Sequence, residues 1–247
     1  MDAPSTLVAI AGAFLLAGFV KGVIGLGLPT VSIGLLGLLM TPAQAAAILV
    51  VPSLVTNIWQ AAVGGGLLAL AQRLWPLLAG ICIGTTVGVA FLPLDDNGRA
   101  TVWLGLALAI YAALGLGKVV FSVPRHADTW LGLLMGAATG AITVATGIFV
   151  VPGTPYNQSM EFDRDKLVQA LGLSFTVSTI TLAAALAYTG HVQTSLAWPS
   201  IVALVVALIG MGLGQLTRGE IKAEAFRLWF FVGLMLLGLH LALRGLL

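Results

Sequence analysis

The sequence predicts an all-helical membrane protein that crosses the bilayer several times. Of its 247 residues, 59% are hydrophobic and only 8% are charged, whereas a soluble domain carries about 25% charged residues. Long apolar runs recur along the chain, and most approach or reach the roughly 20 residues that a helix needs to span a bilayer. Segments of about ten residues with alternating polarity, which would indicate a membrane β-barrel, do not occur. The clearest runs cover residues 42–63, 74–92, 102–120, 167–188, 198–216 and 225–243.

The composition also excludes several classes of protein. A formal net charge of +2 is too small to indicate nucleic-acid binding. The single cysteine, Cys82, lies in an apolar run, so no internal disulfide can form and we expect no thiol chemistry. His126 and His191 lie in loops and His240 stands alone in the last apolar run, which gives no metal-ligand spacing. We therefore expect no enzymatic activity, no cofactor and no metal site.

The two halves of the chain repeat the same landmarks in the same order. The segment GFVKG at 18–22 has the spacing of GAATG at 136–140, which places Thr139 opposite Lys21. A Trp-Pro pair in a long apolar run of each half follows later in the sequence. Similar segments in the same order indicate a duplicated unit. The predicted repeats cover residues 1–120 and 121–247.

Each repeat is predicted to contain a glycine-broken helical hairpin followed by three long helices. The hairpins cover residues 6–40 and 129–152, where glycines and prolines interrupt the apolar runs. The predicted long helices cover about 42–63, 73–93 and 98–120 in the first repeat, and about 165–189, 194–216 and 222–246 in the second.

The basic residues favour opposite orientations of the two repeats in the membrane. Basic residues concentrate in cytoplasmic loops, and eight of the eleven fall on one side only if each hairpin returns to the side where it began. Arg99 and Arg244 then lie outside, as do both termini. Inverted repeats with broken helices are typical of secondary transporters. The inner basic residues are Arg73, Lys118, Arg125, Arg164, Lys166, Arg218, Lys222 and Arg227.

Lys21 is the most informative residue of the first hairpin. A lysine at bilayer depth costs about 2.5–3.5 kcal/mol on insertion scales. None of the nine acidic residues falls inside an apolar run, so no intramembrane carboxylate is available to neutralise it. A bound anion would offset the cost, which favours an anionic substrate. In the alternative, residues 6–21 cross the membrane completely and the lysine extends to the lipid headgroups.

The glycines and the proline of the first hairpin predict an opened backbone. Pro29 is suited to the first turn of a second short helix. The free N–H groups of Thr30 and the next two residues would then form an anion site at a helix N-terminus. Gly25 and Gly27 lie at the predicted hairpin tip, whereas the G-x-x-x-G motif at 18–22 has the spacing of closely packed helices.

The second hairpin contributes Thr143, Thr146 and Gly147 to the predicted site. The two hydroxyl groups could donate hydrogen bonds to an oxyanion, and the glycine offers a flexible break in the helix. The alternative for each threonine is a hydrogen bond back to the preceding turn of its own helix.

A polar stripe follows one face of the helix predicted at 42–63. Ser53, Thr56, Asn57 and Gln60 are spaced i, i+3, i+4 and i+7, so they share one helix face. In a membrane such a face contacts protein or a water-filled cavity. We expect Asn57 and Gln60 to line the substrate path, and hydrogen bonding between helices is the alternative role for the stripe.

The hairpin GFVKGVIGLGLPT, the following PAQAAAILVVPSLVTNIWQ and the partial repeat TGAITVATG resemble the TauE/SafE family of sulfite and sulfonate exporters over essentially the whole chain. The resemblance implies a multi-pass protein of the bacterial inner membrane. It assigns the family's glycine motif to Gly22, Gly25 and Gly27. This chain has Leu28 and Pro29 where many members continue with glycines.

The resemblance and the predicted site together favour a secondary transporter that exports a small sulfur oxyanion by alternating access. The expected partners are an organic or inorganic sulfur oxyanion, such as sulfoacetate or sulfite, and the lipid bilayer, and a homodimer is left open. One alternative is a channel or uniporter for another small anion. The other is a membrane subunit that does not transport.

Overall fold

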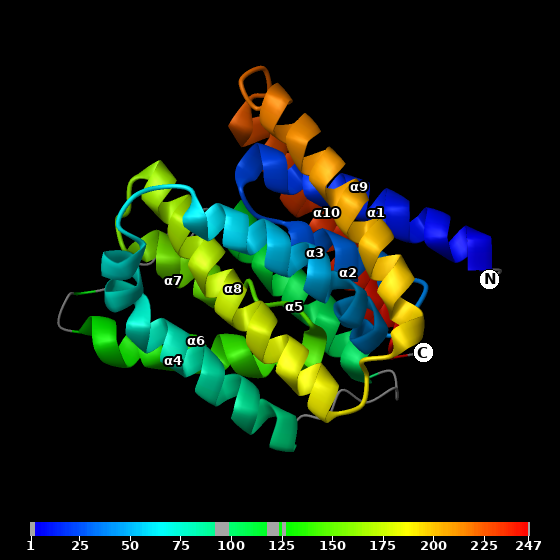
Figure 1. The fold of residues 1–247 in the computed structure, drawn as a ribbon, viewed down its shortest axis with the longest axis horizontal. Coiled ribbons are helices and arrows are strands. Elements are labelled where there is room, and N and C mark those ends of the chain that lie inside the picture. Colours follow the sequence, from blue (N-terminus) through cyan, green and yellow to red (C-terminus); the bar gives the residue numbers. More distant parts are fainter. Residues whose placement is uncertain (1–2, 92–98, 118–123, 125–126, 247) are drawn as a thin grey trace.

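The protein is a bundle of helices that pack side by side (Figure 1). The computed structural model describes residues 3–91, 99–117, 124 and 127–246, and every regular element within them is a helix. Eight of these helices are long and apolar enough to cross a membrane, which confirms the predicted all-helical membrane fold. They are α1 (Ala3–Ile24), α3 (Pro42–Ala62), α4 (Leu67–Phe91), α5 (Arg99–Leu116), α6 (Asp128–Thr146), α8 (Arg164–Tyr188), α9 (Ala197–Thr217) and α10 (Ala223–Arg244).

The first hairpin consists of α1 and the short helix α2 (Leu28–Leu36), and its two arms differ in length. The chain turns between them through left-handed φ angles of 79° at Gly25 and 112° at Gly27, a conformation that glycine adopts at no steric cost. The arm formed by α1 has 22 residues and that formed by α2 has nine. The first arm is therefore long enough to span the membrane, while the second is not.

The first hairpin returns to the end of the bundle where it began. Near the C-terminal end of α1, Phe19 packs edge-on against Phe226 in the first turn of α10. The carbonyl of Leu38, just after α2, instead accepts a hydrogen bond from Arg244 at the last turn of α10. Since α10 spans the bundle, the break and the exit of the hairpin lie at opposite depths (Figure 1).

The second hairpin consists of α6 and the seven-residue helix α7 (Gly153–Ser159). Its break begins at Gly147, with a φ of 76°, and continues through non-helical residues to Pro152, the residue that caps α7. The predicted hairpin ended at residue 152, so its second arm lies further along the chain than predicted. The branched residues between the glycine and the proline disfavour an earlier helix start.

Helices of the first half of the chain pair with helices of the second. The α1 helix packs along α9, α4 along α6, α3 against α8, and α5 against α10. Glycines allow the closest approaches: a Cβ on Gly84 would lie 2.0 Å from the carbonyl oxygen of Ala137, and one on Gly18 2.2 Å from that of Ala207. The G-x-x-x-G motif at 18–22 thus has the packing role predicted for it.

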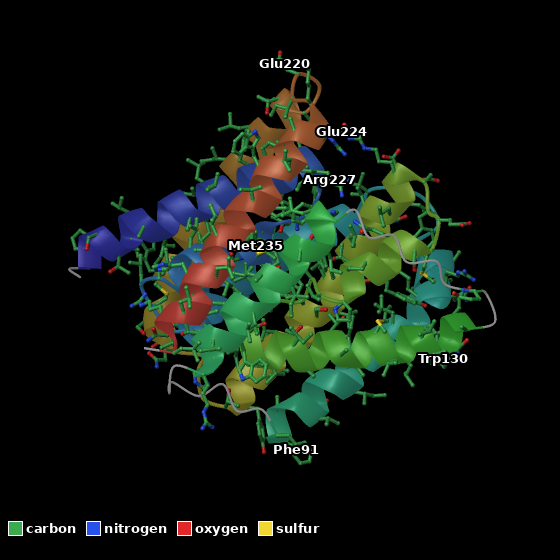
Figure 2. The ribbon with its side chains drawn as sticks, turned by 180° about the vertical axis from the view of Figure 1, so that it is seen from behind. Phe91, Trp130, Glu220, Glu224, Arg227 and Met235 are labelled. Carbon is green, nitrogen blue, oxygen red and sulfur yellow. The ribbon has the colours of Figure 1, made fainter. Side chains whose placement is uncertain are left out.

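The ends of the helices mark two opposite sides of the molecule. Figure 2 shows Glu220 and Glu224 at the tip where α9 passes to α10, with Arg227 further along α10, and Phe91 at the far side. We call the side with this tip the basic end, since Arg164 and Arg218 also lie at helix ends there. Lys118, Arg125 and the predicted boundary between the repeats fall outside the described residues.

Candidate functional site

Lys21 lies in the last turn of α1, and only 4% of its surface is exposed. Its ammonium donates a hydrogen bond of 3.0 Å to Thr56 Oγ1 and a second to Asn57 Oδ1, both on α3. The Thr56 hydroxyl donates its own proton to the carbonyl of Pro52, so it accepts from the lysine. The ammonium is therefore held inside the protein, which argues against the alternative in which Lys21 extends to the headgroups.

The positive charge of Lys21 has no anionic partner among the described residues. The one ion pair among them joins Arg73 to Asp128 at 2.6 Å, at the basic end. Asp2, Asp95 and Asp96 lie outside the described residues. The described acidic residues are Asp128, Glu161, Asp163, Asp165, Glu220 and Glu224, and all occupy loops, caps or first turns of helices.

The polar stripe of α3 is buried along its length. Asn57 donates from Nδ2 to Ser53 Oγ at 2.9 Å, and Ser53 Oγ lies 3.1 Å from Thr179 Oγ1 on α8. Because the ammonium can only donate, it fixes the Asn57 amide with its oxygen toward Lys21. The stripe therefore joins α1, α3 and α8 in one hydrogen-bonded network. Ser53, Thr56, Asn57 and Gln60 are all at most 7% exposed.

Gln60, one turn beyond Asn57, reaches the break of the first hairpin. Its Nε2 donates to the carbonyl oxygen of Gly25 at 2.8 Å, and its Oε1 is buried without a hydrogen-bond partner among the described residues. A carbonyl only accepts, so this contact also fixes the amide orientation. The structure thus brings together four of the predicted site residues, namely Lys21, Gly25, Asn57 and Gln60.

Substitution of Gly25 by alanine should destabilise the hairpin through its backbone conformation. A Cβ at Gly25 would find its nearest neighbours at 3.4 and 3.8 Å, so space is adequate. The left-handed φ of 79° should instead cost alanine about 1–2 kcal/mol. We expect a lower melting temperature in detergent for Gly25→Ala and a smaller decrease for Gly25→Asn, because asparagine tolerates this region better.

The matched control for that comparison is Gly233→Ala, at a helical position on α10 with open space around it. We expect this variant to melt no lower than the wild type, since alanine favours helix. Equal melting temperatures for the alanine and asparagine variants at Gly25 would show that the left-handed backbone does not limit stability there.

The start of α2 agrees with the prediction in one respect and differs in another. The helix begins at Leu28 after the cap residue Gly27, and the N–H of Val31 already bonds to the Gly27 carbonyl at 2.9 Å. The Thr30 hydroxyl donates to the same carbonyl at 3.0 Å. Pro29 lies in the first turn, as predicted, but the prediction of a free N–H at Val31 was wrong, because the helix begins at Leu28. No described hydrogen bond links Thr30 to Lys21.

The threonines of the second hairpin bond to their own helix. Thr143 Oγ1 donates to the Thr139 carbonyl, and Thr146 Oγ1 to that of Ile142, each at 2.7 Å. These bonds correspond to the alternative role, in which each threonine bonds to the preceding turn of its own helix. Gly147 faces the first half, since a Cβ there would lie 2.8 Å from a side-chain atom of Ile33. Donation to a substrate would require these hydroxyl groups to give up the bonds to their own helix.

A second buried polar group lies between α7 and α8, and its α7 members, Thr154 and Asn157, were not predicted. Asn157 Nδ2 donates to the Gly153 carbonyl at 2.9 Å and to Ser174 Oγ at 3.3 Å. The oxygens Asn157 Oδ1, Thr154 Oγ1 and Ser178 Oγ are buried and have no partner in the described part of the chain. In the sequence this group is indicated only by the polar run that follows Pro155, and such a run is typical of a loop, whereas in the structure it belongs to helix α7.

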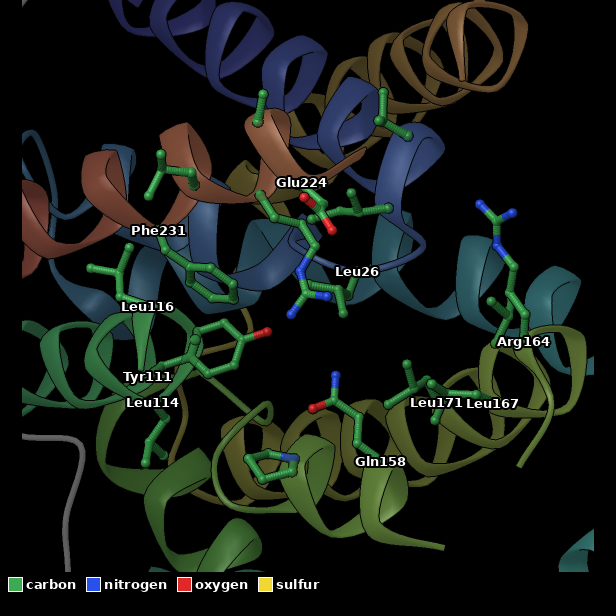
Figure 3. Close-up of a pocket in the computed structure, with 18 of the residues that line it drawn as sticks. Leu26, Tyr111, Leu114, Leu116, Gln158, Arg164, Leu167, Leu171, Glu224 and Phe231 are labelled. Carbon is green, nitrogen blue, oxygen red and sulfur yellow. The ribbon is translucent and has the colours of Figure 1, made fainter. Parts of the chain in front are cut away.

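A cavity of about 990 Å³ opens near the first hairpin break, between α5, α7, α8 and α10 (Figure 3). Val23, Ile24 and Leu26 line it from the hairpin, and Val168 lines it from α8. A Cβ on Gly25 would lie 3.4 Å from Val168. One layer of side chains therefore separates this cavity from the Gly25–Gln60 contact.

The described residues contain no group of three histidine, cysteine, aspartate or glutamate side chains placed to hold a metal ion. The polar groups that surround Lys21 are hydroxyls and amides, which donate and accept hydrogen bonds. Such a set, with a single ammonium, is suited to binding a small anion.

Comparison with known proteins places this architecture in a family. The family profile described as sulfite exporter TauE/SafE matches residues 10–241, nearly the whole chain. A search of curated proteins finds no match, and a search of solved structures finds none. Both hairpin breaks, Lys21 and the polar stripe of α3 lie inside the matched range. The chain therefore belongs to the sulfite exporter TauE/SafE family of membrane proteins.

Proposed function

We propose that the protein is a secondary transporter that exports a small sulfur-containing oxyanion, either sulfite or an organosulfonate such as sulfoacetate, by alternating access. The observation that carries the proposal is the buried ammonium of Lys21, which bonds to the neutral oxygens of Thr56 and Asn57 and has no described carboxylate partner. Membership of a sulfite exporter family supports a sulfur oxyanion as the substrate and transport, not catalysis, as the activity.

An anion would complete the hydrogen bonding of Lys21. An ammonium has three N–H donors, and Thr56 and Asn57 account for two. The third has no partner in the described part of the chain and would bond to an oxygen of sulfite or a sulfonate, and such charge-assisted bonds are about twice as strong as neutral ones. The second N–H of the Gln60 amide, held at Gly25, is a further donor at this site. A bound anion would offset the cost of the buried charge.

We infer that the two halves are inverted repeats. In the two repeats α1 corresponds to α6, α3 to α8, α4 to α9 and α5 to α10. The contact of α1 with α9 therefore corresponds to the contact of α6 with α4, while α3–α8 and α5–α10 are each a contact between two corresponding helices. The left-handed glycines correspond as well: Gly25 donates its N–H to the Lys21 carbonyl, and Gly147 donates to that of Thr143. This correspondence supports Thr143, one turn beyond Thr139, as the counterpart of Lys21.

The repeats suggest how access could alternate. Discontinuous helices near the midplane hold the substrate in many transporters with inverted repeats. Here the cavity of about 990 Å³ approaches the Lys21 site from the basic end. Rocking of one half against the other would close this route and open one from the opposite end. Gln60, which bonds to the hairpin break, lies where the two routes would meet.

We further propose that the basic end faces the cytoplasm and that both termini lie outside the inner membrane. The excess of arginine and lysine at this end follows the distribution found in membrane proteins. The cavity with Arg164, Arg218 and Arg227 would then open to the cytoplasm, where an exporter collects its substrate.

Outward movement of an anion needs no coupling ion, because an inside-negative potential drives it. The potential supplies about 2.3 kcal/mol per charge per 100 mV, so a monoanion should distribute about 50-fold across a liposome membrane at 100 mV. We expect purified protein to carry methanesulfonate toward the positive side when a potassium diffusion potential is the sole driving force. Transport that required an imposed proton or sodium gradient would contradict uniport.

A further inference from the structure

We propose that the cavity at the basic end is a binding site for amphiphilic organic anions. The protein would then prefer sulfonates with a hydrocarbon chain to inorganic sulfite as its transported substrate. The inference rests on the proposed export function, since it treats the cavity as the cytoplasmic route to Lys21. It goes further because it assigns the cavity a ligand class of its own, through residues remote from the Lys21 hydrogen bonds.

The charged residues of the cavity favour an anionic head group. Arg164, Arg218 and Arg227 line it, and Glu224 is the one carboxylate among its lining residues. Arg218 Nε is buried without a described hydrogen-bond partner. Burial and the neighbouring charge of Arg164 lower the pKa of Arg218, while Asp165 raises it. Two guanidinium groups close enough to repel each other provide planar, paired donors for a sulfonate, carboxylate or phosphate.

Apart from Gln158 and the Tyr111 hydroxyl, the remaining wall of the cavity is apolar, which favours a hydrocarbon part in the ligand. Figure 3 shows Leu167 and Leu171 on one wall and Leu116 and Phe231 on another, with the Tyr111 hydroxyl between them. A volume of about 990 Å³ lies at the upper end of the roughly 300–1,000 Å³ found for small-molecule sites. Sulfite has four non-hydrogen atoms and would leave most of this wall uncovered.

The positions of the charged and apolar lining residues set the orientation of a bound amphiphile in the cavity. Arg164 and Arg218 line the cavity from the ends of α8 and α9, whereas Val23 and Leu26 line it from the hairpin. An amphiphile would therefore bind with its head beside Arg164 and Arg218 and its chain directed to the break. Lys21 lies beyond that break and bonds to α3. Capture in the cavity and coordination by Lys21 are thus separate steps.

The test is the dependence of affinity on chain length, measured with protein in nanodiscs of zwitterionic lipid. Methane-, butane- and hexanesulfonate, together with sulfite, would be titrated by calorimetry below their micelle concentrations. We expect affinity to rise about two- to fourfold for each added methylene group, as expected for burial of hydrocarbon. The variant Arg164→Gln/Arg218→Gln should weaken binding of every sulfonate about tenfold or more, as for loss of charge-assisted bonds.

The matched control is Arg99→Gln, which removes one exposed arginine from the N-terminal end of α5, while the C-terminal end of α5 lines the cavity. It should leave the sulfonate affinities unchanged. Equal affinity for all chain lengths, or a series unaffected by the double substitution, would overturn the proposal. If hexanesulfonate were excluded in nanodiscs containing anionic phosphatidylglycerol, the cavity would be a lipid headgroup site and the proposal would also be wrong.

The same experiment separates this inference from the proposed function. Lys21→Gln should reduce transport about tenfold or more yet keep the chain-length dependence of binding, since Lys21 is absent from the cavity lining. Chain-length dependence without transport by the wild type would support the cavity site and contradict the export function. Sulfite transport without chain-length dependence would support export and overturn the cavity site.

Discussion

Lys21→Gln should reduce export of sulfite from proteoliposomes by about 10- to 150-fold. This range corresponds to the roughly 1.5–3 kcal/mol that a hydrogen bond to a charged group contributes. Glutamine keeps an amide N–H donor, although its side chain is one bond shorter than that of the lysine that contacts Thr56 and Asn57, and it carries no charge to hold an anion. Efflux of radiolabelled sulfite, with equal amounts of reconstituted protein, measures the change.

The control for this substitution is Lys222→Gln, which removes an exposed lysine charge from the loop before α10. It should transport at the wild-type rate. The melting temperature of Lys21→Gln should not fall, because the variant no longer buries a charge that has no ion-pair partner. If Lys21→Gln retained more than half of the wild-type rate, Lys21 would not bind the transported anion.

Gly84→Ala should cause the largest loss of stability among single methyl additions in the bundle. A Cβ at this position would lie 2.0 Å from the Ala137 carbonyl oxygen and 2.6 Å from two further backbone atoms. Backbone cannot rotate away as a side chain can, so α4 and α6 must separate. We expect a loss of about 3 kcal/mol, near the upper end for overpacking, and a melting temperature lower by about 6–12 °C.

Gly212→Ala on α9 is the matched comparison, since a Cβ there meets no atom within 4 Å. It adds the same methyl group and the same preference for helix, and should melt at or slightly above the wild-type temperature. If Gly84→Ala melted at the same temperature as Gly212→Ala, the close contact of α4 with α6 would not exist in the membrane.

The sequence was most informative where a feature depends on neighbouring residues. Apolar runs of the required length predicted all six of the long helices that follow the hairpins, because helix length follows from bilayer thickness. The spacing of Ser53, Thr56, Asn57 and Gln60 predicted a shared face, and all four side chains are buried. Glycines in sequence also predicted the break between α1 and α2.

Features that depend on residues far apart in the chain could not be predicted. Nothing in the sequence pairs Lys21 with Asn57, 36 positions later, or places Arg164, Arg218 and Arg227 at one cavity. Whether a threonine bonds to a ligand or to its own helix depends on its rotamer. Thr143 and Thr146 both donate to carbonyl oxygens of their own helix. Element boundaries also shifted: the second hairpin was predicted to end at residue 152, whereas its second arm, α7, begins at Gly153.

The most direct test of the central claim is to locate an anion by its anomalous scattering in crystals of the protein soaked with selenite, a close analogue of sulfite. An oxygen bonded to the Lys21 ammonium would place selenium about 4 Å from Nζ, given charge-assisted bonds of about 2.7–2.9 Å. We predict a peak at that distance, beside Gln60 and Gly25, that is absent from Lys21→Gln crystals. Selenium found only among the cavity arginines, or equally in both crystals, would contradict the assignment of Lys21 as the anion site.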